Sequence, residues 1–222
     1  MTIDLNVDLG EGGANDEALT ALASSVNIAC GGHAGDDETM VRAVELALLH
    51  GSAIGAHPSY DDPENFGRRA LDLPLDEVTA SVARQVAALA RHADLHHVKP
   101  HGALYNQAQS DPELARAIIA GISQVLPSTL IYTLPQGALA QAALNAGHRV
   151  AGEGFIDRGY QSNGQLIPRS EPGALLDGEA AIAQARRLAQ RSDIATLCVH
   201  SDSPEALHLL KKVRESLSDD LS

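Results

Sequence analysis

Apolar residues gather in short runs along the chain, and turn-forming residues separate one run from the next. The runs are "TIDLNVDL", "VNIAC", "SAIGA", "HHVKP", "TLIYTL", "HRVAGEG" and "ATLCVH". Runs of this length between turn residues are typical of buried β-strands. The two-residue period of a strand places Asn6 and Asp8 on the same side of the first one. The pattern therefore predicts seven short strands.

A helix-like segment follows nearly every run. The clearest extends from Pro74 to Ala93, where apolar residues recur at helical spacing. Helix-starting pairs and helix-ending glycines mark further boundaries: Asp111–Pro112, Ser203–Pro204, Gly51 and Gly147. Strict alternation of strand and helix predicts a parallel sheet covered by helices.

Seven or eight such units fit either a compact (β/α) barrel or an open doubly wound sheet. Residues 57–74 and 154–173 interrupt the alternation, and both segments are rich in Pro, Gly, Asp and Asn. Long loops in a compact domain are usually functional. Because no linker or low-complexity tract divides the chain, we expect one domain over residues 1–222.

Composition narrows the classes of function. The chain has 222 residues, 44% of them hydrophobic, and a formal net charge of −13. An acidic protein is a poor ligand for nucleic acid, whose phosphates are bound by Lys and Arg. Cys30 and Cys198 are predicted to be buried, reduced thiols. The acidic N-terminus and the lack of a run of about 20 apolar residues predict no membrane association and a cytoplasmic location.

The histidines separate into two groups by position. Four follow strand-like runs by zero to three residues: His33, His57, His101 and His200. Five fall in or beside predicted helices, where exposed or capping roles are expected: His50, His92, His96, His148 and His208. Carboxyl ends of parallel strands meet on one face of a β/α fold, so the first group is predicted to share one pocket.

Charged and amide residues mark the same strand ends. These candidates are Asn6, Asp8, Glu11, Lys99, Glu153, Asp157 and Arg158. Structural alternatives exist for single residues; Lys99, for example, could form a salt bridge to Asp8 or Glu153. Together they describe a polar cluster on an apolar scaffold, which is the usual form of a catalytic pocket.

Three chemistries are open to this set. Asp8 with His33 and His57 or His200 could bind a divalent metal, although no HExxH or HxH spacing is present. Lys99 could form a Schiff base. Alternatively, Lys99 and His101 could stabilise negative charge while Asp8 transfers protons.

A glycine-rich turn adds one more possible element of the site. The turn "ACGGHAGDD", which contains Gly32, could offer backbone N–H groups to an anion. A GxxxxGK[ST] phosphate loop is absent.

Six segments together resemble the LamB/YcsF family, whose members are the A component of prokaryotic 5-oxoprolinase. They are "DLNVDLGEG", "VNIACGGHAGD", "IGAHPSYDDPENFGRR", "HVKPHGALYN", "GEGFIDRGY" and "LCVHSDSP", and they span residues 4 to 204. The chain departs from the family pattern at Val7, at Ser201 and at Gly13–Ala14.

The resemblance implies a (β/α)7 TIM-like barrel related to deacetylase and glycoside-hydrolase barrels. It also implies ATP-dependent opening of 5-oxo-L-proline to L-glutamate, with partner subunits B and C and with ATP bound either here or on a partner. The catalytic residues expected on this basis are Asp8, Lys99, His101 and Glu153. The expected substrate-binding residues are Asn6, Gly32, His33, His57, Tyr105, Asp157, Arg158 and His200. A metal-dependent amidohydrolase that needs no ATP and a non-catalytic substrate-binding subunit are the alternatives.

Overall fold

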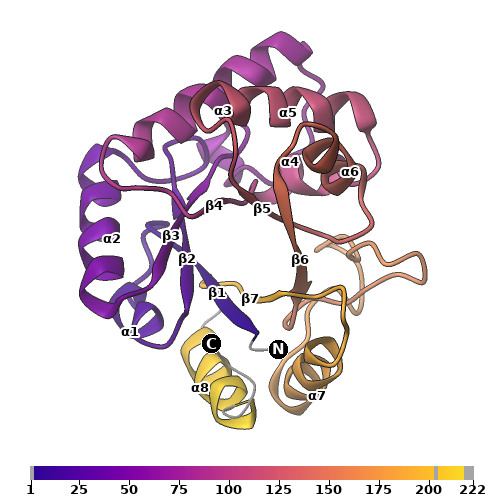
Figure 1. Cartoon of the computed structure of the whole chain (residues 1–222). Coiled ribbons are helices and arrows are strands. Elements are labelled where there is room, and N and C mark those ends of the chain that lie inside the picture. The colour runs from indigo at the N-terminus through magenta and orange to yellow at the C-terminus, as the bar shows by residue number, and fades with distance from the viewer. Residues whose placement is uncertain (1–2, 203–204, 218–222) are drawn as a thin grey trace.

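The computed structural model describes residues 3–202 and 205–217. Within them, seven parallel strands follow one another in chain order and close into a barrel (Figure 1). The strands are β1 (Asp4–Leu9), β2 (Ser25–Ala29), β3 (Ala53–His57), β4 (His97–Val98), β5 (Leu130–Thr133), β6 (Arg149–Phe155) and β7 (Thr196–Val199). Closure comes from β7 pairing with β1, which brings Asn6 beside Cys198. The predicted (β/α)7 barrel is confirmed, and the open sheet is excluded.

Helices surround the strands on the outside of the barrel (Figure 1). They are α1 (Asp16–Thr20), α2 (Asp37–His50), α3 (Leu75–Ala90), α4 (Gly102–Gln107), α5 (Pro112–Val125), α6 (Ala138–Asn145), α7 (Gly178–Ala189) and α8 (Ala206–Ser216), with a 3-10 turn, η1 (Pro63–Asn65). Among these helices, none has both the length and the apolar character needed to cross a membrane.

Most of the predicted helix boundaries are confirmed. The Asp111 carboxylate accepts hydrogen bonds from the backbone N–H groups of the first turn of α5, so it is the N-cap. Gly51 ends α2 in the left-handed conformation that glycine adopts without strain. The helix predicted over 74–93 is α3, which is shorter at both ends. The predicted start at Ser203–Pro204 lies outside the described residues.

The two faces of each strand have different chemistry. On β1, Leu5, Val7 and Leu9 belong to the apolar core, which fills the space between the barrel and its helices. Asn6 and Asp8 alternate with them and point into the barrel, where Asn27 of β2 donates hydrogen bonds to both. The inside of this barrel is therefore lined by polar side chains, unlike the branched apolar layers common in (β/α)8 barrels.

The lowest layer of these side chains, here called the barrel floor, consists of Asp4, Ser25, Tyr132 and Thr196. The Asp4 carboxylate accepts hydrogen bonds from the hydroxyls of Ser25 (2.8 Å), Thr196 (2.5 Å) and Tyr132 (3.3 Å). Hydroxyl groups rotate to suit their partners, so the half-buried Asp4 carboxylate is well satisfied here.

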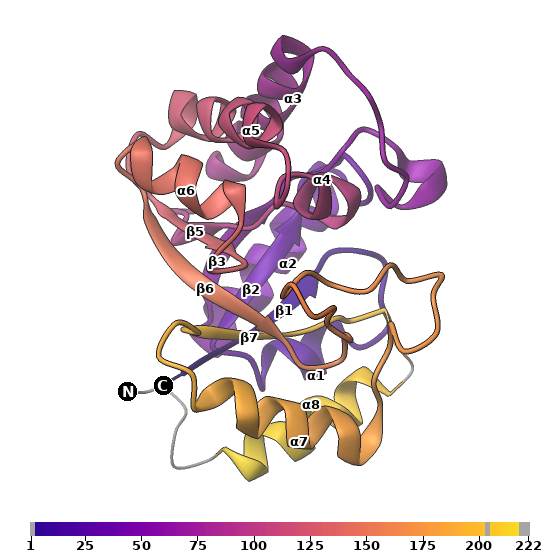
Figure 2. The ribbon, with the colours of Figure 1, turned by 90° about the vertical axis from the view of Figure 1, so that its right-hand side faces the viewer.

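The two long loops predicted from the sequence leave the strands at the same end of the barrel. Figure 2 shows the segments that follow β3 and β6 at the carboxyl ends of the strands. Asp202 connects them, because its Oδ2 atom pairs with Arg68 (2.5 Å) from one loop and Arg169 (3.1 Å) from the other. The carboxyl end of the barrel is therefore covered by two loops that share an ion-pair partner.

Candidate active site at the carboxyl end of the barrel

Lys99 is the central cation of the barrel mouth, the name used here for Asp8, Lys99, Glu153, Tyr105 and the histidines around them. Only 2% of Lys99 is exposed, and its Nζ atom lies 3.1 Å from Asp8 Oδ1 and 2.9 Å from Glu153 Oε1. Burial opposes its charge, but Asp8, with Cys198 and Glu153 beside it, raises the pKa of Lys99 well above its usual range. The salt bridge considered as an alternative from the sequence is thus present, and it joins Lys99 to both carboxylates.

Asp8 is the better paired of these two carboxylates. Burial alone would raise its pKa, but Lys99, followed by the surrounding histidines, lowers it well below its usual range. Its Oδ1 atom also accepts a hydrogen bond from Asn27 Nδ2 (3.0 Å). Asp8 is therefore ionised at neutral pH and can accept a proton only if its partners move.

Glu153 and Tyr105 are less well paired. Glu153 is fully buried, and its Oε2 atom has no hydrogen-bond partner; the hydroxyl of Tyr105 is likewise buried without one. Burial, followed by the nearby Glu153 carboxylate, raises the pKa of Tyr105 well above its usual range. A neutral phenol and a carboxylate oxygen without partners are suited to hydrogen-bond a substrate.

Three of the predicted strand-end histidines meet around one carboxylate. Glu11, His33, His57 and His101, here called the imidazole cluster, place one ligand atom each within 4.8 Å of all the others. His33 Nε2 lies 2.9 Å from Glu11 Oε1, and His101 Nδ1 lies 2.9 Å from His57 Nε2. Burial lowers the pKa of His57 to about 3 and that of His101 well below its usual range.

The fourth strand-end histidine, His200, stands apart from that cluster. Its Nδ1 atom and its backbone N–H both contact the Asp157 carboxylate, at 3.0 and 3.1 Å. Burial would raise the pKa of Asp157, but His200 lowers it. Asp157, predicted to bind substrate, is thus positioned to orient the His200 ring.

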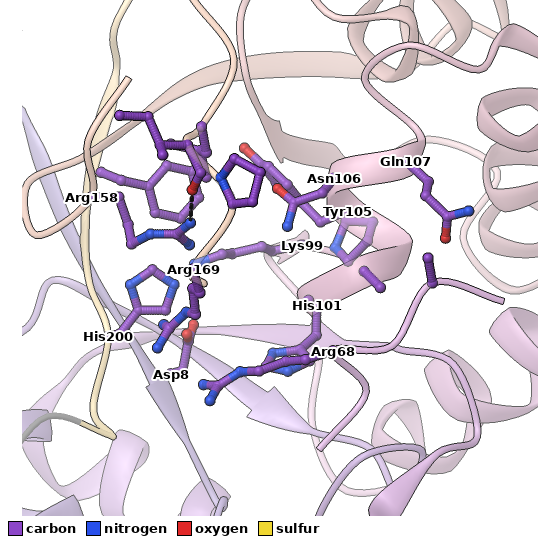
Figure 3. A pocket seen from close by; sticks show the side chains of 18 of the residues that line it. Asp8, Arg68, Lys99, His101, Tyr105, Asn106, Gln107, Arg158, Arg169 and His200 are labelled. Carbon is purple, nitrogen blue, oxygen red and sulfur yellow. Dashed lines mark hydrogen bonds and ion pairs between the residues drawn. The ribbon is translucent and has the colours of Figure 1, made fainter. Parts of the chain in front are cut away.

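Asp8, Lys99, Tyr105 and three of the strand-end histidines line a cavity of about 450 Å³ (Figure 3). Figure 3 shows Lys99 crossing its middle, with Asp8 and His200 on one side and Tyr105 on the other. The residues that line it include Asp8, His57, Arg68, Lys99, His101, Tyr105, Asn106, Gln107, Phe155, Arg158, Arg169 and His200.

Arginines form the outer wall of this cavity. The Arg158 guanidinium donates to the carbonyls of Ala174 (3.1 Å) and Ile167 (2.7 Å), which orient it without neutralising its charge. Burial lowers the pKa of Arg158, yet an arginine keeps its proton at neutral pH. With Arg68 and Arg169, which both pair with Asp202, it places three guanidinium groups along this wall.

Five of the predicted site residues do not line the cavity: Asn6, Gly32, His33, Glu153 and Asp157. Asn6 lies below Lys99 and accepts a hydrogen bond from its ammonium at 3.2 Å, so it supports the site from beneath. Gly32 packs against Ser59 and Gln85, whose side-chain oxygens lie 2.5 Å from where a Cβ atom would stand. The neighbouring Gly31 N–H is used within the turn by the Ala34 carbonyl (2.9 Å). Close packing therefore explains Gly32, and the Gly31 N–H is already used within the turn.

The prediction of an exposed or capping role was wrong for one histidine of the second group. His148 is buried because its ring lies between β5 and α5, where it accepts from the Thr129 N–H (3.2 Å) and pairs with Ser123 (2.8 Å).

Two further buried residues of the site, His97 and Cys198, were not predicted, although the strand period marks both of them. His97, Lys99 and His101 alternate in "HVKPH", and His97 is fully buried with its Nε2 atom 2.8 Å from Asn27. In "TLCVH" the same period places Cys198 beneath His200, and the Cys198 Sγ atom accepts a hydrogen bond from Lys99 at 3.0 Å. Burial raises the pKa of Cys198 well above its usual range, so it is a neutral thiol.

Comparison with known proteins agrees with this architecture. The crystal structure of a lactam utilization protein from Thermus thermophilus is 39% identical, covers 99% of this chain and 97% of its own, and superposes with a TM-score of 0.89. A family 4 carbohydrate esterase from Streptomyces lividans is 12% identical over 98% of this chain and 88% of its own, with a TM-score of 0.53. The catalytic domain of a peptidoglycan N-acetylglucosamine deacetylase from Eubacterium rectale is 10% identical over 99% of this chain and 86% of its own, also at 0.53.

The esterase and the deacetylase share the barrel alone. The model of the LamB/YcsF family, by contrast, matches residues 3–221, which is nearly the whole sequence. The chain belongs to the LamB/YcsF family.

Proposed function

We propose that this chain is the A component of an ATP-dependent 5-oxoprolinase, which opens 5-oxo-L-proline to L-glutamate with hydrolysis of ATP to ADP and phosphate. The observation that carries the proposal is the buried Lys99, held between two carboxylates in a chain that is 39% identical to a lactam utilization protein. A cytoplasmic location and assembly with subunits B and C belong to the same proposal.

The chemistry of a five-membered lactam explains why such a site is useful. The lactam is an unreactive amide, and transfer of a phosphoryl group from ATP to its oxygen makes the ring carbon electrophilic. Water then adds to that carbon, and the ring C–N bond breaks as the nitrogen takes up a proton. A second water hydrolyses the acyl phosphate that remains and releases L-glutamate and phosphate. Negative charge grows on the substituents of the ring carbon during these steps, and the Lys99 ammonium is placed to stabilise it.

The walls of the cavity suit the rest of the substrate. Arg158 offers a guanidinium fork to the carboxylate of 5-oxo-L-proline or to a phosphate. The Tyr105 hydroxyl, which lines the cavity and is buried without a partner, is suited to an oxygen of the intermediate. Asp8 or Glu153 serves as the base for water.

A second candidate is an amide hydrolase that uses a metal ion in place of ATP. The imidazole cluster favours it, because three histidines and a glutamate surround one point at the mouth. The two candidates differ in their need for a nucleotide.

A glutamate-release assay tests both. 5-Oxo-L-proline is incubated with the chain alone and with subunits B and C, each with and without ATP, and glutamate and ADP are quantified. We expect equimolar glutamate and ADP from the three-protein mixture with ATP, and little from the chain alone. Ring opening without ATP would favour the second candidate, and no glutamate under any condition would refute both.

A further inference from the structure

The neutral imidazole rings of His57 and His101, in the barrel mouth, point nitrogen lone pairs at each other. His57 Nδ1 lies 2.7 Å from the Lys99 carbonyl, and His101 Nε2 lies 3.0 Å from the Phe66 carbonyl. A carbonyl oxygen only accepts, so each neutral ring carries its single hydrogen on that nitrogen. The other two nitrogens, His57 Nε2 and His101 Nδ1, then face each other as bare acceptors at 2.9 Å.

A third acceptor converges on the same point. Glu11 Oε1 lies 3.6 Å from His101 Nδ1 and 3.9 Å from His57 Nε2. The side chains of His57 and His101 are 1% and 5% exposed and that of Glu11 is 6% exposed, so bulk water does not compensate their mutual repulsion. Converging buried acceptors of this kind are stabilised by a cation between them.

We propose that Glu11 Oε1, His57 Nε2 and His101 Nδ1 bind one divalent transition-metal ion, with zinc the best fit. Tetrahedral zinc with ligand bonds of about 2.0–2.1 Å places its ligand atoms about 3.3 Å apart. The three observed separations, 2.9, 3.6 and 3.9 Å, bracket that value. Two histidines and a glutamate leave the fourth zinc position open for water or substrate.

His33 supports this site without being a ligand. Its ring stacks on that of His101, with centroids 3.7 Å apart and planes 5° from parallel. An imidazole binds a metal in its own ring plane, and one ion cannot lie in two stacked planes. His33 instead donates from Nε2 to Glu11 Oε1 at 2.9 Å, which makes it a positioning residue.

The loop after β3 is shaped to hold these rings. Phe66 adopts a left-handed backbone conformation (φ +54°), unusual for a residue with a side chain, and its carbonyl receives the His101 N–H. Gly67 also has positive φ (+62°), and a Cβ atom there would lie 2.9 Å from His33 Cβ and 3.2 Å from His101 Cδ2. The backbone at 66–67 therefore fixes the orientation of His101.

Carboxylate oxygens surround the proposed ion. Glu11 Oε1 is one of its ligands, and Asp8 Oδ1 lies 3.4 Å from His57 Nε2. His57 and His101 both line the cavity, so a ligand in the fourth position arrives from the side of Lys99.

Zinc binding to the intact chain tests the proposal without lactam, ATP or partner subunits. The purified protein is stripped with a chelator and dialysed against zinc, and bound metal is quantified by elemental analysis. We expect one zinc ion per chain, and visible absorption bands of a four-coordinate site when Co²⁺ replaces zinc. Because activity is not read, failure of this test is distinct from failure of the proposed function.

Four variants locate the ion. His101→Ala and Glu11→Gln each remove a ligand and are expected to weaken zinc affinity by more than about 100-fold, the upper end of the range for a supporting residue. His33→Phe keeps a ring stacked on His101 but removes the donor to Glu11, and the expected loss is about 10–100-fold. His50→Ala, on the exposed end of α2, is the control and should bind zinc as the parent chain does.

Two results would overturn the proposal. If the stripped parent protein takes up no zinc at millimolar concentration and its melting temperature does not rise, His57 and His101 share a proton instead of a metal. If His200→Ala abolishes zinc uptake while His101→Ala does not, the ion lies at Asp8, Cys198 and His200. The parent protein's response to zinc decides the question even if a variant fails to fold, because a ligand stabilises the state that binds it.

Discussion

The barrel floor and the barrel mouth both place polar side chains inside the ring of strands, but they satisfy them in different ways. In the floor, the Asp4 carboxylate receives three hydroxyl groups. In the mouth, Tyr105 and Glu153 bury oxygen atoms without hydrogen-bond partners, and two bare imidazole nitrogens face each other. Of the five buried side-chain atoms without partners among the described residues, three belong to His33, Tyr105 and Glu153.

The difference lies in the chemistry of the groups used. Hydroxyls donate and accept, so they close a network among themselves, whereas carboxylates and neutral imidazole nitrogens that only accept need a ligand, an ion or a proton. Unpaired buried groups cost stability, and natural proteins retain them where function requires them. The barrel floor is therefore expected to stabilise the fold. The barrel mouth is expected to lower the free energy of unfolding, because its unpaired groups are kept for binding a ligand.

The largest effect is expected at Lys99. Lys99→Met keeps most of the side-chain stem but leaves Asp8 and Glu153 buried without their shared cation. Breaking such a pair destabilises by about 3–5 kcal/mol, and loss of a charge-stabilising donor slows turnover by about 100-fold or more. Denaturant unfolding and the glutamate assay measure the two quantities. Lys211→Met on the exposed face of α8 is the control, and a normal turnover in Lys99→Met would contradict a role in catalysis.

A smaller effect on stability is expected at His200, which is half-buried. His200→Ala removes the hydrogen bond to Asp157 and should cost about 1 kcal/mol, while turnover falls by about 100-fold, the lower end for loss of an acid–base group. Calorimetry and the glutamate assay are the measurements. His50→Ala should change neither, and equal losses at both positions would invalidate the grouping of histidines by strand ends.

Substitution of Tyr105 is expected to change turnover without lowering the stability of the fold. Tyr105→Phe deletes a buried hydroxyl that has no partner, so the free energy of unfolding should stay constant or rise by about 1 kcal/mol. If the hydroxyl hydrogen-bonds substrate, turnover should fall about tenfold, which corresponds to about 1.4 kcal/mol. A clear loss of stability in this variant would mean that the mouth is satisfied within the protein.

A Tyr→Phe substitution in the barrel floor should lower stability and leave turnover unchanged, the reverse of the result expected at Tyr105. Tyr132→Phe removes long hydrogen bonds, at 3.3 Å, to Asp4 and Ser25 and should cost about 0.5–1 kcal/mol. Turnover should remain close to the parent value. The pair of Tyr→Phe variants compares floor with mouth directly, and a turnover loss at Tyr132 would show that the two layers are coupled.

The strand–helix alternation and the set of strand-end residues could both be predicted from the sequence. Alternation of short apolar runs with helices reduced the architectures to a barrel or an open parallel sheet, and the family resemblance implied the (β/α)7 barrel. Asp8, Lys99, His57 and His101 could be found because strand ends in a parallel barrel gather at one place. Arg158 was found in the same way, but Arg68 and Arg169 of the outer wall could not be, because a loop's path has no sequence period from which they could be placed.

The local sequence pattern was sufficient to predict the order of strands and helices. It also predicted the side of β1 on which Asn6 and Asp8 lie, because the period of a strand depends only on local geometry. Folding of the whole chain was needed to close the sheet, to bring Lys99 to two carboxylates at once, and to set His57 and His101 face to face with bare nitrogens. Those outcomes depend on contacts between residues far apart in the chain and on backbone carbonyls that select which ring nitrogen carries the proton. Pairings of this kind are fixed by packing, and no local pattern encodes them.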